Sequence, residues 1–113
     1  MAVAAAAVNV FKTVTHVVGL NTVGIYTAPV GYTGVMLLAQ VTNTGSETQT
    51  ISFGHSRDGV ETEIVKNLSI PPSDTANLLA GKLVIETNDS LTMVGSTSTD
   101  LKYLSSVLET SNL

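Results

Sequence analysis

Short runs in which apolar and polar residues alternate recur along this chain about every ten residues. The runs are rich in valine, isoleucine and threonine, which together supply 36 of the 113 residues. β-Branched side chains suit a pleated sheet, and alternation places one set of them on a buried face. Glycine, proline, asparagine or aspartate stands at the breaks between runs, as in β-turns. The pattern predicts an all-β fold, and no segment shows a sustained helical period.

The runs predict about eight strands, and their spacing is typical of a sandwich or a barrel. We expect a single-domain antiparallel β-sandwich of jelly-roll-like type over residues 10–113. Residues 1–9 are expected to form an extended arm that precedes it. The expected strands cover residues 10–18, 22–28, 35–42, 48–56, 60–67, 82–87, 90–94 and 101–109.

Two of the connections between strands are expected to be hairpins. Asp58-Gly59 separates two alternating runs, and this dipeptide is a strong predictor of a two-residue hairpin turn. Residues 82–87 and 90–94 are expected to pair with each other across Asn88-Asp89. The most apolar run, residues 35–42, is hydrophobic on both faces in its first half, which is typical of a central strand or of one covered on both sides.

Composition excludes several classes of function. The net charge is −4 and the five basic residues are scattered, which argues against binding to nucleic acid. No apolar stretch approaches the roughly 20 residues that cross a bilayer, so no membrane partner is expected. The apolar start has no basic residues before it and is short for a signal peptide, so we expect a protein that is not secreted. Cysteine is absent, which removes disulfides and thiolate metal sites.

The sequence offers little material for catalysis, and we expect no catalytic residue, cofactor or metal site. His16 and His55 lie far apart in the sequence, and no serine stands in a nucleophile motif such as Gly-x-Ser-x-Gly. Glu61 and Glu63 share a strand face, which permits a paired-carboxylate or calcium site. A solvated outer face that discourages aggregation explains the same pair more simply.

Five residues are candidates for contact with a partner. Ala4 and Val8 belong to the Ala/Val-rich arm, which loses almost no side-chain entropy at its alanines when it docks. Tyr32 lies in a glycine-flanked turn and is the aromatic residue that we expect to be exposed. Arg57 and Asp58 lie at the expected hairpin tip, and arginine is favoured at interface hot spots.

Four segments carry a further similarity: residues 25–34 (IYTAPVGYTG), 64–71 (IVKNLSIP), 80–91 (AGKLVIETNDSL) and 104–110 (LSSVLET). Together they resemble small virion proteins of tailed bacteriophages, particularly phages that infect cyanobacteria and other marine bacteria. The resemblance covers most of residues 9–110 and lies in strand and turn patterns. It implies a small β-sandwich structural protein without enzymatic activity, and it assigns no functional residues.

The expected function is therefore that of a virion structural protein located in the virion and assembled in the host cytoplasm. The preferred hypothesis is a capsid decoration or cement protein that binds the major capsid protein shell. An accessory protein of the neck, tail or baseplate is the alternative, and a receptor- or glycan-binding module is another. We expect a homo-oligomer, such as a trimer, with other virion proteins as partners.

Overall fold

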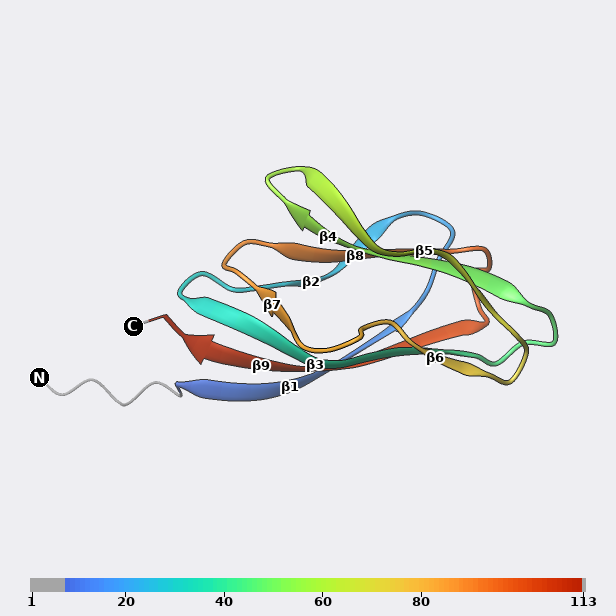
Figure 1. Cartoon of the computed structure of the whole chain (residues 1–113), viewed down its shortest axis with the longest axis horizontal. Coiled ribbons are helices and arrows are strands. Elements are labelled where there is room, and N and C mark those ends of the chain that lie inside the picture. Colours follow the sequence, from blue (N-terminus) through green and yellow to red (C-terminus); the bar gives the residue numbers. More distant parts are fainter. Residues whose placement is uncertain (1–7, 113) are drawn as a thin grey trace, which may run out of the picture.

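The computed structural model describes residues 8–112, and these residues contain nine β-strands in two antiparallel sheets. The sheets stack face to face as two layers (Figure 1). The strands are β1 (Asn9–Val17), β2 (Val23–Thr27), β3 (Tyr32–Asn43), β4 (Gln49–Arg57), β5 (Val60–Ile70), β6 (Thr75–Asn77), β7 (Leu83–Ile85), β8 (Ser90–Gly95) and β9 (Leu101–Ser111). The predicted all-β sandwich is confirmed.

The strand order identifies the type of sandwich. One sheet has the order β1-β9-β3-β6, with β7 also paired to β3, and the other has the order β2-β8-β4-β5. The short strands β6 and β7 pair with different parts of β3, so together they occupy the place of one interrupted strand. Counted in this way the domain has eight strands in two four-stranded sheets, which is the jelly-roll arrangement.

The core lies between the two sheets and is built from the inward-facing residues of each strand. On β9 alternate residues from Leu101 to Glu109 are buried, as the period of two requires. The largest buried rings are those of Phe53 and Tyr103, whose centroids lie 5.9 Å apart across the sandwich. The buried apolar residues are Val18, Ala28, Met36, Ala39, Val41, Ile51, Phe53, Ile70, Leu78, Ile85, Leu91, Met93, Leu101, Tyr103 and Val107.

The hairpin at Asp58-Gly59 is confirmed. Arg57 pairs with Val60, so the loop has two residues, and Asp58 and Gly59 have φ angles of 52° and 79°. Positive φ at both central positions matches a type I′ turn, whose twist fits the flanking strands. The return strand continues to Ile70, three residues beyond its predicted end.

The expected hairpin between residues 82–87 and 90–94 is wrong. β7 pairs with β3 in the first sheet, whereas β8 pairs with β2 and β4 in the second. The chain crosses between sheets at Asn88, which has a φ of 71° and whose backbone N–H donates to Ala28 O. The backbone N–H of Ala28 in turn donates to Asp89 O, so this turn is fixed to the end of β2 and not to a hairpin.

Candidate functional site

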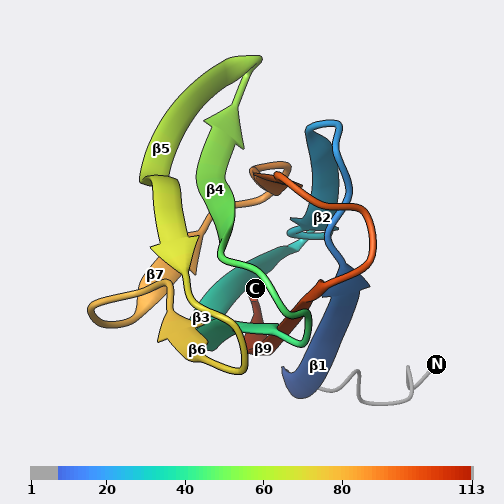
Figure 2. The ribbon, with the colours of Figure 1, turned by 90° about the vertical axis from the view of Figure 1, so that its right-hand side faces the viewer.

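The outer side of β1 is an open sheet edge. Within the described residues β1 pairs with β9 alone, in a register that runs without a shift from Asn9 to Val17. Figure 2 shows β1 at the margin of its sheet. Unpaired edges of this length are templates for another strand, and most proteins protect them.

The other sheet edges of the domain carry such protection. β5 has two register shifts against β4 and carries the exposed charges Glu61, Glu63 and Lys66. β2 has five residues and one shift, and β6 and β7 have three residues each. β1 has nine residues and one charged side chain, Lys12, whose Nζ lies 3.0 Å from Glu109 Oε1 of the neighbouring strand. β1 is therefore the edge best suited to accept a partner.

The hydrogen bonds at the two ends of β1 show which backbone groups face outward. The N–H of Ser111 donates to Val8 O, and the N–H of Val18 donates to Leu101 O. Even-numbered residues are therefore the hydrogen-bonded partners of β9 throughout the unbroken register. The odd-numbered residues from 9 to 17 direct their N–H and C=O groups away from β9, toward the open edge.

An apolar row crosses the outer face of the same sheet. The register places Phe11 of β1 opposite Leu108 of β9, Leu108 opposite Val35 of β3, and Val35 opposite Val84 of β7. Phe11 is 74% exposed and Val84 is 54% exposed, while the two middle residues are half-buried. We call these four residues the outer row. A contiguous apolar row on a surface marks a site of contact more strongly than scattered single residues do.

Arg57, one of the predicted contact residues, is held within the domain. Its Nε and one terminal nitrogen donate to the two Asp89 oxygens at 2.8 and 2.6 Å, and the same terminal nitrogen donates to Glu86 at 2.8 Å. His55 Nε2 lies 3.0 Å from Asp89 Oδ2, and the Glu86 backbone N–H also donates to this oxygen. The cluster joins the end of β4 to the turn at 86–89.

The electrostatics of this cluster centre on Asp89, which is 3% exposed. The hydrogen bonds from Arg57 hold the pKa of Asp89 well below its usual range, against the opposing effect of burial, and the contact with His55 adds to the lowering. The same bonds raise the pKa of Arg57. Such a saturated carboxylate stabilises the fold and is not available as a base or as a metal ligand.

The structure brings the described contact candidates to one end of the molecule. Tyr32 O accepts a hydrogen bond from Thr87 Oγ1, and Asp58 lies with Arg57 beside the same turn at 86–89. Val8, 63% exposed, pairs through its carbonyl with the last residue of β9. Ala4 lies outside the described residues. Tyr32 is half-buried, so the expectation that it is the exposed aromatic residue is wrong.

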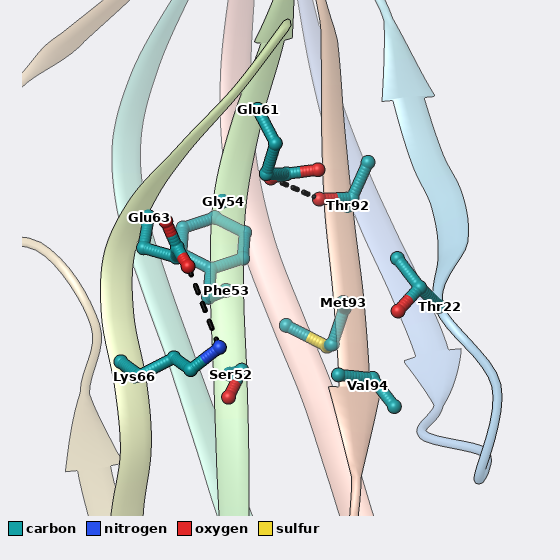
Figure 3. A pocket seen from close by; sticks show the side chains of 10 residues that line it. All are labelled: Thr22, Ser52, Phe53, Gly54, Glu61, Glu63, Lys66, Thr92, Met93 and Val94. Atoms are coloured by element: carbon teal, nitrogen blue, oxygen red, sulfur yellow. Dashed lines mark hydrogen bonds and ion pairs between the residues drawn. The ribbon is translucent and has the colours of Figure 1, made fainter. Parts of the chain in front are cut away.

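The expected glutamate pair belongs to a shallow hollow on the second sheet (Figure 3). Both glutamates are exposed: Glu61 accepts a hydrogen bond from Thr92 Oγ1 at 2.6 Å, and Glu63 lies 3.4 Å from Lys66 Nζ. The hollow has a volume of about 130 Å³, below the roughly 300 Å³ at which ligand pockets begin. Among residues 8–112 no cluster of three or more His, Asp or Glu side chains could hold a metal ion. The same part of the chain contains no helix long and apolar enough to cross a membrane.

The outer row was not predicted, although the sequence contains a signal for it. Phe11 stands on the side of residues 9–17 that carries the polar residues Asn9, Thr13 and Thr15, and Leu108 and Val35 belong to strands with apolar residues on both faces. The double-sided apolar pattern of residues 35–42 predicts a central strand or one covered on both sides, and β3 is central in its sheet, between β9 and the short strands β6 and β7. In the single chain the second face of that strand is left half-exposed.

Comparison with solved structures finds chains of similar fold. A chain from the disulfide-linked pili of Bacillus endospore appendages aligns with a TM-score of 0.55 and 13% identity, over 98% of this chain and 98% of that one. A chain of the T13 IBDV viral particle aligns with a TM-score of 0.55 and 12% identity, over 92% of this chain and 31% of that one. At such identities the likeness shows the fold alone. No protein-family model and no curated protein matches the chain.

Proposed function

We propose that this protein is a non-enzymatic structural subunit of a multi-copy protein assembly and that it associates through the open edge of β1. The observation that carries the proposal is the contrast between edges: β1 is long and continuous and carries one charged side chain, Lys12, which is paired with Glu109 of β9, whereas β5, β2, β6 and β7 are bulged, charged or short. Strand addition at such an edge supplies main-chain hydrogen bonds, and side chains of the partner set specificity. The partner in this proposal is a further copy of the chain.

The assembly that we favour is the virion of a tailed bacteriophage. The four segments that resemble phage virion proteins support this choice, and the fold is shared with a chain of a viral particle. We favour a position on the capsid shell, as a decoration protein, and the neck, tail or baseplate is the alternative. Either position calls for a subunit that presents flat β surfaces to neighbours in a symmetric array.

A subunit of a pilus-like filament is a second candidate. The observation that favours it is the match to the Bacillus appendage chain, which spans 98% of both chains, whereas the viral match spans 31% of its chain. This protein contains no cysteine. Disulfides therefore could not link the subunits of a filament built from it, and non-covalent contacts such as strand pairing would hold them together.

A proline in the open edge tests the role of β1. Thr13 directs its N–H outward, so Thr13→Pro removes one donor from the edge and leaves the bonds to β9 in place. The control Thr13→Val keeps the N–H and a β-branched side chain. Light scattering during size-exclusion chromatography is expected to show oligomers for the wild type and for Thr13→Val, and monomers for Thr13→Pro. A folded wild type that stays monomeric at about 100 μM contradicts the proposal.

Electron microscopy of the wild-type assemblies separates the two candidates. Closed rings or shell fragments, and binding of the protein to tailed phage capsids, support a virion subunit. Open helical filaments support the pilus-like alternative, because a head-to-tail contact that does not close produces a filament.

A further inference from the structure

We propose that residues 1–7 of one copy lie across the outer row of a neighbouring copy. This inference rests on the proposed self-assembly and names a second contact within it. The outer row comprises Phe11, Leu108, Val35 and Val84, and it forms a continuous apolar line over four strands.

The composition of the segment fits the surface that it would cover. Residues 1–7 consist of methionine, alanine and valine, with no charged or polar side chain. Small side chains allow a chain to lie close to a sheet face, and alanine loses almost no side-chain entropy when it is immobilised. Alanine is depleted in β-strands, so this segment is better suited to packing on a face than to adding to an edge.

The reach of the segment is also sufficient. Adjacent strands lie about 4.8 Å apart, so a row across four strands is roughly 14 Å long. Seven extended residues span about 23 Å. The segment can therefore cross the whole row and still connect to Val8.

The direction of the chain favours a neighbouring copy over the same copy. Val8 directly follows the segment, and its carbonyl oxygen accepts a hydrogen bond from the Ser111 N–H. The chain is therefore already aligned with β1 at Val8. To cover its own sheet the chain would have to reverse direction before Val8. Residues 1–7 contain none of the turn-forming residues Gly, Pro, Asn, Asp or Ser. A segment that continued in line with β1 would pass beyond the end of its own sheet, where a neighbouring copy could receive it.

The absence of cysteine from the chain permits a direct test by cross-linking. Isotope-labelled Ala4→Cys is mixed with unlabelled Val84→Cys, assembled, and treated with a short bismaleimide. We expect covalent heterodimers at a yield at least five-fold above a control mixture that contains Val60→Cys. Val60 matches Val84 in type and is 67% exposed, but it lies on the second sheet.

The double variant Ala4→Cys/Val84→Cys, diluted below its assembly concentration, tests the competing arrangement, in which the segment lies on its own sheet. An internal cross-link within its monomers would show that the segment covers its own sheet and would overturn the inference. A heterodimer yield equal to that of the Val60 control would overturn it as well.

Light scattering on the same samples separates this inference from the proposed function. Oligomers that form without the specific cross-link would contradict the inference and leave the role of the β1 edge intact. Monomers in all samples would contradict the proposed function.

A substitution in the row gives an independent readout. Val84→Ser lies on β7, far from the β1 edge in the strand order, and its side chain is already 54% exposed. We expect the concentration for half-assembly to rise about ten-fold with little change in the unfolding midpoint, because apolar burial between copies is lost. Val60→Ser is the matched control and is expected to leave assembly unchanged. Equal assembly of both variants would exclude the row from the contact.

Discussion

The hydroxyl of Tyr26 on β2 donates a hydrogen bond to Glu109 Oε2 on β9 at 2.7 Å and so joins the two sheets of the sandwich. The Glu109 side chain is 5% exposed, and its other oxygen lies 3.0 Å from Lys12 Nζ of β1. A buried carboxylate is stable only when such partners satisfy it. Gly34 on β3 provides the space for this contact, since a Cβ there would meet the Tyr26 hydroxyl at 2.9 Å.

Substitution of Gly34 is expected to break this link. In Gly34→Ala the added methyl group displaces the Tyr26 ring from Glu109 and leaves a buried carboxylate with one partner fewer. We expect the free energy of unfolding to fall by about 2 kcal/mol, measured by urea denaturation. Gly19→Ala is the control, because a Cβ at Gly19 meets no atom within 4 Å. Equal stability of the two variants would contradict the role assigned to Gly34.

Stability is expected to decline at alkaline pH. Burial raises the pKa of Tyr26 above its usual value, and the hydrogen bond to Glu109 raises it further, while burial raises the pKa of Tyr103 to about 12. Tyrosine in the unfolded chain ionises near pH 10. The stabilisation is therefore fully present below pH 10 and is lost as the pH rises from there toward the folded-state pKa values.

Urea midpoints between pH 8 and 11 measure this effect. The midpoint is expected to hold between pH 8 and 9 and to drop by pH 11, with Tyr103 contributing about 1 kcal/mol to the loss. Tyr103→Phe is expected to reduce the slope above pH 10. An unchanged slope in this variant would show that Tyr103 does not take part.

The sequence predicted which residues face inward more reliably than which strands are neighbours. Alternation of period two fixes the face of each side chain, and Ile51 and Phe53, which alternate in the predicted strand 48–56, are both buried. It does not say to which sheet a strand belongs. From the sequence, residues 82–87 and 90–94 are expected to pair with each other because a short turn separates them, but Asn88 adopts a positive φ and leads the chain into the other sheet.

The candidate contact surface was predictable only in part. The Asp58-Gly59 turn follows from local conformational preference, whereas the alignment of Phe11 with Leu108, Val35 and Val84 depends on the register of four strands that are distant in sequence. The sequence also indicated Arg57 as a contact residue. Its ion pairs with Asp89 and Glu86 could not be foreseen, because they require the crossing of the chain at residues 86–89.

Asp89 is expected to confer acid-sensitive stability. Asp89→Asn replaces a buried carboxylate that accepts from Arg57 and from the Glu86 backbone, so we expect a loss of about 2 kcal/mol at pH 7. Hydrogen bonding lowers the folded-state pKa of Asp89, so its contribution is present above about pH 4 and is lost as the pH falls below that value.

The wild type and Asp89→Asn are therefore expected to converge in stability below pH 4, as followed by thermal denaturation. Asp58→Asn at the hairpin tip is the control. Asparagine also adopts the positive φ required there, so this variant is expected to keep the wild-type midpoint at pH 7. A gap between the wild type and Asp89→Asn that stays constant down to pH 2 would argue against the ionised cluster.

Asn43, at the end of β3, is expected to be the most sensitive polar residue of the core. It is 0% exposed, and its Nδ2 donates to Glu47 O at 2.7 Å and to Ile70 O at 2.9 Å, while its Oδ1 accepts from the Gly45 N–H. The side chain thus joins the turn after β3 to the end of β5. Asn43→Asp keeps the shape but places a carboxylate against two carbonyl oxygens, and we expect a loss of about 3 kcal/mol at pH 7.

Protonation of the introduced carboxyl group restores one donor, so the Asn43→Asp variant should recover part of its stability as the pH falls toward 4. Asn112→Asp near the end of the chain is the control, because Asn112 is exposed, and we expect a change below about 1 kcal/mol. Thermal denaturation of both variants at pH 7 and pH 4 measures the difference. If Asn43→Asp matches the control at pH 7, the buried amide does not hold these two turns together.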